Sequence, residues 1–252
     1  MEIIGRGFVA QNLDPIAGRH NDVVVFAAGV SSGTSAAHEE FAREADLLYQ
    51  TIDDCAARGK RLVYFSTASP TLYGGSLVYG REDGPVYPSS PYARHKLAME
   101  AVLASSTVDY LTLRATHLIG PRQRPHQLPP VMVAQVRAKS VRVFRGVYRD
   151  FLAITDLVTI LDALLSADVG RQVINVASGF PVPIEDIVEH LERRMGVTAI
   201  REYVDRPEPA VTISTERLRR LVPIVDTLLF DEYYYQRALD EFLALSLDSA
   251  TV

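Results

Sequence analysis

The chain has 252 residues, of which 48% are hydrophobic and 23% are charged, and its net charge is −5. These values are ordinary for a soluble protein with a sizeable core, and they argue against a nucleic-acid partner held by bulk charge. With one cysteine, Cys55, no basic-then-apolar leader and no apolar run of about 18 residues, we expect a cytoplasmic protein without an internal disulfide, a metal site or a membrane span.

Apolar runs rich in β-formers alternate with helical patterns over the first two thirds of the chain. The predicted strands cover residues 3–4, 23–28, 62–65, 110–113 and 173–176. Residues 41–58 and 92–105 have helical periodicity, and the first of these segments ends at Gly59. Its apolar side carries Phe41, Ala45, Leu48, Ile52 and Cys55. This alternation predicts a parallel sheet covered by helices.

The remainder of the chain has a different pattern. Residues 120–130 hold four prolines and no periodicity, which predicts a loop. Helices are expected over residues 130–139 and 155–167, from Pro183 to Gly196, and over 226–245. In the last helix the candidate buried side chains are Leu229, Tyr233, Leu239 and Phe242. Segments after Gly120 are expected to build a smaller lobe against the sheet.

The first apolar run leads into a glycine loop, Gly5-Arg6-Gly7-Phe8. Such a loop allows a pyrophosphate to approach the backbone closely at a helix N-terminus. A dinucleotide-binding βαβ unit also needs an acidic residue about 20 residues further on, after its second strand, to hold the adenosine ribose. Residues 23–28 end in Ala27-Ala28 without that acid. Arg6 either reaches a phosphate, including the 2′-phosphate of NADP, or is an exposed loop residue.

The segment SPYARHKLAME carries the strongest chemical signal. Tyr92 and Lys96 are four residues apart on a predicted helix, so their side chains share a face. A nearby ammonium favours the phenolate and lowers the pKa of a tyrosine, which then exchanges a proton near neutral pH. The segment follows a strand that ends in hydroxyl residues, at the edge of an α/β sheet where ligands bind.

Six segments in order resemble the extended short-chain dehydrogenase/reductases, the group of nucleotide-sugar epimerases, dehydratases and ketoreductases. They are GRGFVA at 5–10, VVFAA at 24–28, YFST at 64–67 with YG at 73–74, PYARHK at 91–96 with Glu100, LR at 113–114 with GP at 120–121, and RDF at 149–151 with Asp156 and NV at 175–176. No single motif is decisive, but their order and spacing indicate the fold.

The resemblance implies an α/β fold, a Rossmann-like doubly wound parallel sheet with a small C-terminal substrate lobe. The Ala-Ala-Gly ending of residues 23–28 resembles the family's fourth strand, which lies beside the first. We therefore expect the second and third strands, roughly 40 residues of the usual pattern, to be lacking. The core would comprise residues 1–120 with 148–176, and the lobe residues 121–147 and 177–252. A homodimer through the helices at 41–58 and 92–105 is implied.

The resemblance also implies roles for individual residues. Tyr92 would be the general acid and base, and Lys96 would lower its pKa and bind the nicotinamide ribose. The assisting hydroxyl is either Thr67, by position at the strand end, or Ser69, by distance from Tyr73. The cofactor, NADP or NAD, would contact Gly5, Arg6, Gly7, Phe8, Ala27, Ala28 and Lys96. Phosphates of a nucleotide-sugar substrate would contact His117, Arg122, Arg124 and Arg149, with solvent exposure as the alternative for these side chains.

Three functions remain open on the sequence. We favour a 4-ketoreductase acting on a nucleotide-activated deoxysugar or sugar, because a shortened adenosine pocket suits a cofactor that exchanges. An epimerase, which keeps its cofactor through an internal redox cycle, is the first alternative. The second is a non-redox descendant that has lost dinucleotide binding, namely an acid/base isomerase, cyclase or lyase, or a non-catalytic partner of another enzyme.

Overall fold

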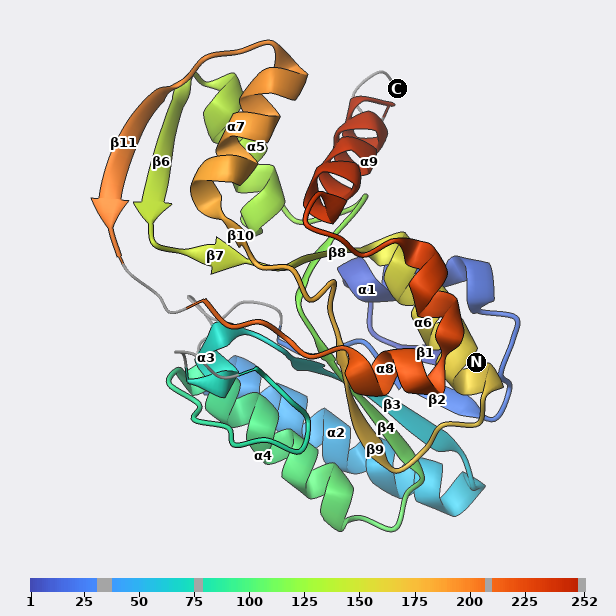
Figure 1. Cartoon of the computed structure of the whole chain (residues 1–252). Helices are drawn as coiled ribbons and strands as arrows, with labels where there is room; N and C mark the ends of the chain where they lie inside the picture. The colour runs from blue at the N-terminus through green and yellow to red at the C-terminus, as the bar shows by residue number, and fades with distance from the viewer. Residues whose placement is uncertain (31–37, 75–78, 207–209, 249–252) are drawn as a thin grey trace.

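Five parallel strands form the central sheet of the computed structural model, which describes residues 1–30, 38–74, 79–206 and 210–248 (Figure 1). In sheet order the strands are β1 (Glu2–Ile4), β2 (Val23–Phe26), β3 (Arg61–Thr67), β4 (Tyr110–Ala115) and β9 (Gln172–Val176). The predicted parallel sheet is confirmed, although β2 ends two residues earlier than expected, before Ala27.

The first strand lies directly beside the strand that resembles the family's fourth. Only the short helix α1 (Phe8–Gln11) and the 3-10 turn η1 (Asp14–Ile16) lie between β1 and β2. Ile4 pairs with Phe26 in parallel register. On the other side of β1, no strand is paired within the described residues. The expected sheet without its second and third strands is therefore present.

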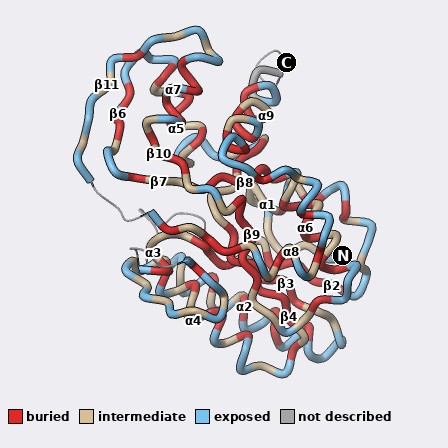
Figure 2. The backbone as a smooth tube through the Cα atoms, viewed as in Figure 1, coloured by how far each residue is buried: buried red, intermediate tan, exposed pale blue. Residues whose placement is uncertain are grey.

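Alternating side chains of the sheet face two different helical layers. Val24 and Phe26 pack with α2 (His38–Arg58) and α4 (Pro91–Ser105). Val23 and Val25 face the opposite layer, which includes α6 (Ile154–Ser166). Figure 1 shows α2 and α4 along one face of the sheet and α6 on the other, and Figure 2 shows the strands buried between them. This two-sided burial explains why the strands are almost wholly apolar.

A smaller lobe lies above the carboxyl edge of the sheet (Figure 1). Its parallel pair β6 (Ser140–Arg145) and β11 (Ile200–Asp205) packs against α5 (Leu128–Arg137) and α7 (Ile184–Met195). Two further short pairs connect it to the core. They are β5 (His117–Ile119) with β8 (Phe151–Ala153), and β7 (Tyr148–Arg149) with β10 (Val182–Pro183). The remaining short helices are α3 (Pro70–Tyr73) and α8 (Glu216–Leu221). The strands outside the central sheet, β5 to β8, β10 and β11, were not predicted from the sequence.

The C-terminal helix begins later than the sequence predicted. A 3-10 segment, η2 (Pro223–Leu228), precedes α9 (Tyr234–Asp248). Leu229 between them takes a left-handed φ of 51°, which interrupts helical geometry. Leu229 and Tyr233 are consequently exposed, so their predicted burial is wrong, whereas Leu239 and Phe242 are buried as expected. No helix in the described ranges is long and apolar enough to cross a membrane.

Candidate functional site

Helix α4 places Tyr92 and Lys96 on one face at the carboxyl edge of the sheet. Pro91 occupies the first turn, where its missing N–H costs nothing, and the Ser90 hydroxyl caps the helix by accepting from Ala93 N at 3.1 Å. Lys96 Nζ lies 5.9 Å from the centroid of the Tyr92 ring. The helix thus brings these two predicted residues together.

Thr67 and Ser69 follow one another at the end of β3 but have different partners. The side chain of Thr67 shares a hydrogen bond with Tyr92. The hydroxyl of Ser69 instead lies 2.8 Å from that of Thr71. Both positions remained open on the sequence, and the geometry now brings Thr67 to Tyr92. Ser66, one residue earlier on the strand, donates to Glu100.

The pKa of Tyr92 differs from the expected lowering. Burial raises it well above its usual value, and the negative charge of Glu44 raises it further. The hydrogen bond with Thr67 opposes these effects only in part. We predicted that Lys96 would lower the pKa of Tyr92, but the shift comes from burial, Glu44 and Thr67 instead. The charge of Lys96 is paired with the carboxylate of Glu44. In this structure Tyr92 is therefore a neutral phenol, a group that donates a proton.

A buried carboxylate engages the ammonium of Lys96. Glu44, on α2, has no exposed surface, and its Oε1 lies 2.8 Å from Lys96 Nζ. Lys96 also donates to the carbonyl of Phe65 at 3.1 Å. Burial lowers the pKa of Lys96, and Glu44 opposes that effect. Burial alone would raise the pKa of Glu44, but its neighbours His95 and Lys96 lower that pKa to about 2.

The glycine loop is pressed against the end of β2. At Gly5, whose φ is +131°, an added Cβ would lie 2.5 Å from the carbonyl oxygen of Ala27, so only glycine fits there. Gly7 precedes α1, where a Cβ would meet open space, and Phe8 is partly buried. Arg6 is exposed. Because α1 is a single turn, its N-terminus offers a pyrophosphate less dipole than a longer helix would.

The predicted phosphate-binding residues fall into two groups. His117 pairs with Phe151, two residues after Arg149, and burial together with the charge of Arg149 lowers the pKa of His117 to about 3. His117 is thus neutral at physiological pH. Arg122 instead donates to the carbonyl of Gln11 beside the glycine loop. Arg124 is exposed near the start of α5.

Several residues of the resembling motifs form a buried polar network below the site. Arg114 pairs with Glu100 at 2.7 Å and donates to the Tyr73 hydroxyl at 3.2 Å. Tyr73 in turn donates to Asn175 Oδ1 at 2.6 Å. These contacts connect β4, α4, α3 and β9, so the motif residues Tyr73, Glu100, Arg114 and Asn175 have structural partners. Asp150 likewise accepts from Ser178 and Gly179.

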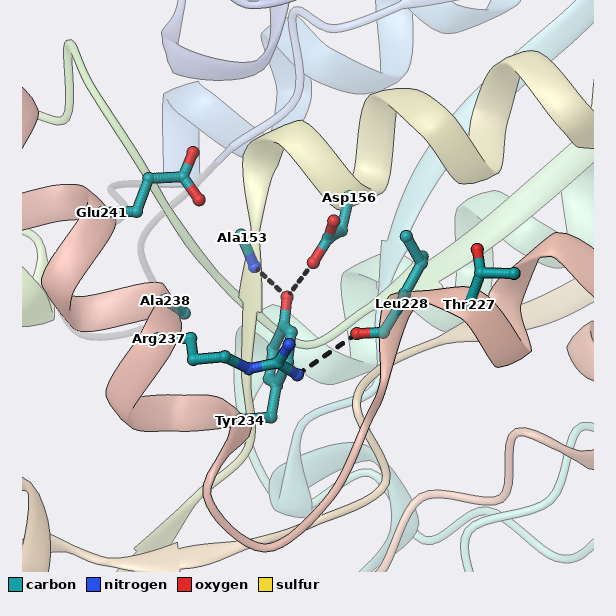
Figure 3. Close-up of a pocket in the computed structure, with 8 residues that line it drawn as sticks. All are labelled: Ala153, Asp156, Thr227, Leu228, Tyr234, Arg237, Ala238 and Glu241. Carbon is teal, nitrogen blue, oxygen red and sulfur yellow. Dashed lines mark hydrogen bonds between the residues drawn. The ribbon is translucent and has the colours of Figure 1, made fainter.

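A cavity of about 260 Å³ lies between α6, η2 and α9, away from these residues (Figure 3). The Tyr234 hydroxyl donates to Asp156 at 2.5 Å and accepts from Ala153 N at 2.9 Å. Arg237 donates to the carbonyl of Leu228. A second cavity, of about 360 Å³, lies beside β6 and β11. Neither is lined by a predicted site residue, and the contacts in the first cavity tie α9 to α6.

Sequence reasoning missed Glu44. It lies on the buried side of α2, four residues before the fully buried Leu48. A carboxylate at a core-facing helix position is rare unless it is paired. The core-facing position of Glu44 could therefore have indicated a buried ion pair. Lys96 was the cation available as its partner.

The chain is similar to known proteins in both sequence and structure. Residues 10–177 match the model of the NAD dependent epimerase/dehydratase family. A UDP-glucuronate 4-epimerase from Thermodesulfobacterium geofontis is 33% identical over 157 residues, which are 58% of this chain and 47% of that protein. The match therefore spans about half the length of that curated relative.

Solved structures share the fold across nearly the whole chain. RMD from Pseudomonas aeruginosa, complexed with NADPH, has a TM-score of 0.79 at 21% identity and covers 96% of this chain and 98% of its own. UDP-N-acetylglucosamine 4-epimerase from Methanobrevibacter ruminantium, in complex with UDP-N-acetylmuramic acid, has a TM-score of 0.75 at 20% identity and covers 94% and 80%. dTDP-glucose 4,6-dehydratase from Bacillus anthracis, in complex with NAD, has a TM-score of 0.72 at 23% identity and covers 96% and 79%.

Proposed function

Because the chain belongs to the NAD dependent epimerase/dehydratase family, an enzyme family, we propose that it is an NAD(P)-dependent 4-ketoreductase of a nucleotide-activated sugar. In this proposal Tyr92 is the general acid, Thr67 assists it, and Lys96 lies beside them. Of the redox chemistry that the family's epimerases and dehydratases use, this enzyme would carry out only the reduction of a ketone.

Tyr92 is a neutral phenol in this structure, which agrees with the role of an acid in the reductive direction. Burial and Glu44 raise its pKa, so the resting side chain carries its proton. Reduction of a ketone needs a proton donor for the carbonyl oxygen, whereas oxidation of an alcohol must begin with a base. Tyr92 would donate its proton to the ketone oxygen, and the Thr67 hydroxyl would hydrogen-bond the same oxygen. The phenolate that results would regain a proton from solvent.

The residues present fit a nicotinamide dinucleotide at its reactive end and depart from the usual pattern at its adenosine end. The small residues Ala28 and Gly29 follow β2 beside Lys96, and a Cβ on Gly29 would lie 2.7 Å from Lys96 Nζ. Gly5 allows the loop its close approach to Ala27. When bound, the dinucleotide supplies the hydride. At the adenosine end, Arg6 would meet a phosphate in place of the missing acid.

The substrate class rests on the relatives and on the lobe. The curated relative and two of the solved neighbours are named for UDP-sugars or dTDP-sugars. Arg149, partly buried beside the neutral His117, suits a phosphate oxygen, because a guanidinium binds it through two donors. We therefore place the sugar ketone at Tyr92 and the pyrophosphate toward Arg149.

Tyr92→Phe tests the proposed acid. With NADPH and a 4-keto nucleotide sugar, we expect kcat to fall by about 10²- to 10⁴-fold, because the phenol proton is lost while the ring is kept. NADPH binding, followed by fluorescence, should persist. Tyr87→Phe is the matched control, since Tyr87 is 65% exposed and lies outside the site. Unchanged turnover in Tyr92→Phe would refute the proposal.

A 4-epimerase is the second candidate, and the curated relative favours it. The two reactions differ in cofactor balance. A 4-epimerase converts UDP-glucuronate to its C4 epimer without net consumption of NAD(P)H, whereas a ketoreductase consumes one NAD(P)H for each ketone. Product analysis by chromatography alongside absorbance at 340 nm distinguishes them. If neither activity nor dinucleotide binding is found at millimolar cofactor, the non-redox alternative is favoured instead.

A further inference from the structure

The carboxylate of Glu44 is enclosed by four polar groups from three other segments. Its Oε1 accepts from Lys96 Nζ at 2.8 Å and from the Tyr64 hydroxyl at 2.7 Å. Its Oε2 accepts from Val30 N at 2.6 Å, and His95 Nε2 lies 3.4 Å away. The side chain has no exposed surface. A carboxylate so deeply buried is stable only as part of a paired, hydrogen-bonded group.

These contacts join four elements at the edge where the reaction would take place. Glu44 comes from α2, Tyr64 from β3, Lys96 from α4, and Val30 follows β2. Gly29 lies over the pair, because a Cβ there would lie 2.7 Å from Lys96 Nζ and 3.1 Å from Glu44 Oε1. The backbone at Gly29 therefore packs closely against the side chains of both Lys96 and Glu44.

We propose, on the premise that Tyr92 is the acid of the proposed function, that Glu44 is a positioning residue, the buried counter-ion that keeps Lys96 charged and fixed beside Tyr92. Lys96 is 2% exposed, so without a carboxylate its ammonium would be an uncompensated charge in the interior. The neutral amine of Lys96 would then be favoured. A neutral amine is a weaker hydrogen-bond donor than an ammonium, so Lys96 would donate less strongly beside Tyr92.

The other charged and titratable groups around Lys96 do not replace Glu44. Tyr64 and Tyr92 are neutral phenols, because burial raises the pKa of both. Glu100, on α4, forms its ion pair with Arg114 of β4 at 2.7 Å. His95 lies beside Glu44 and supplies no negative charge. Among these groups Glu44 is the one carboxylate in contact with the ammonium.

The charge of Lys96 is measured directly, because the chain has three lysines, Lys60, Lys96 and Lys139. Lysine labelled with ¹³C at Cε gives three resolvable NMR signals, and Lys96→Met identifies one of them. In the wild-type protein we expect the Lys96 signal to report an ammonium at neutral pH. In Glu44→Gln we expect its midpoint to fall by about two units, a 100-fold change in proton affinity, since a buried lysine without a partner titrates low.

Glu40→Gln is the matched control, because Glu40 lies on the same helix and is exposed. It should leave the Lys96 midpoint unchanged. An unaltered midpoint in Glu44→Gln overturns the proposal. If Glu44→Gln does not fold, the wild-type titration still decides, because a Lys96 that is already a neutral amine at neutral pH contradicts a counter-ion role. The titration needs neither substrate nor turnover. A negative result for Glu44 is therefore distinguishable from a failure of Tyr92 as the proposed acid, which is measured by kinetics.

Discussion

The side chain of Thr67 is hydrogen-bonded to Tyr92, whereas the hydroxyl of Ser69, two residues further on, is hydrogen-bonded to that of Thr71. The backbone amide of Ser69 even donates to Thr67 Oγ1, at 3.2 Å. The end of β3 thus presents one hydroxyl to the tyrosine and uses the other to shape the loop before α3. This asymmetry separates two residues that the sequence left equivalent.

Thr67→Val should therefore impair turnover, whereas Ser69→Ala should not. Valine keeps the shape of threonine and removes the hydroxyl, so the loss of one donor to the reacting oxygen should lower kcat by about 10²-fold. Ser69→Ala removes a hydroxyl that bonds to Thr71 in the first turn of α3, and we expect less than about a threefold change in kcat. Steady-state kinetics with NADPH checks both. The reverse order of effects would make Ser69 the assisting residue.

Arg6→Ala should weaken NADPH more than NADH. No acid follows β2 in Ala27-Ala28-Gly29, and Arg6 is exposed in the glycine loop, where a 2′-phosphate would find it. A charge-assisted contact is worth about 1.5–3 kcal/mol, so the NADPH Kd should rise by at least about tenfold. Isothermal titration calorimetry with each dinucleotide measures the difference. Arg124→Ala, an exposed arginine near α5, serves as the control, and equal weakening of both cofactors would count against a phosphate contact.

The sequence predicted the central sheet because its strands are buried on both faces and therefore almost wholly apolar. The pairing of β6 with β11 escaped prediction, since these half-exposed strands are about 60 residues apart in sequence and meet through tertiary packing. The Tyr92–Lys96 pair followed from helical spacing. Glu44 did not, because a carboxylate on a helix is usually solvated, and its burial depends on α4, which lies about 50 residues further along the chain.

Glu100→Gln should destabilise the fold strongly. It leaves the guanidinium of Arg114 buried without its counter-charge, and removal of one partner of such a pair costs about 3–5 kcal/mol. Urea unfolding followed by circular dichroism measures this loss in the free energy of unfolding. Glu2→Gln breaks a surface pair with Arg58 and should cost less than about 1 kcal/mol. Similar losses in the two variants would mean that the buried network contributes no more than a surface pair.

The stabilising contribution of Glu44 should disappear in acid. Its neighbours lower its pKa from the ordinary 4.5 to about 2 in the folded chain, so the unfolded chain binds the proton more readily between these values. A depressed carboxyl pKa stabilises the fold above the unfolded value, and this contribution is lost as the pH falls from about 4.5 toward 2. The shift corresponds to up to about 3 kcal/mol.

Unfolding free energies of the wild type and Glu44→Gln, compared at several pH values between 7 and 3, test this dependence. Glutamine cannot ionise, so the variant lacks this part of the acid sensitivity. The difference between the two proteins should be largest at neutral pH and should shrink steadily below about pH 4.5. Glu40→Gln should follow the wild type throughout, because Glu40 is exposed. A difference between wild type and Glu44→Gln that stays constant from pH 7 to pH 3 would show that Glu44 is not held as a buried carboxylate.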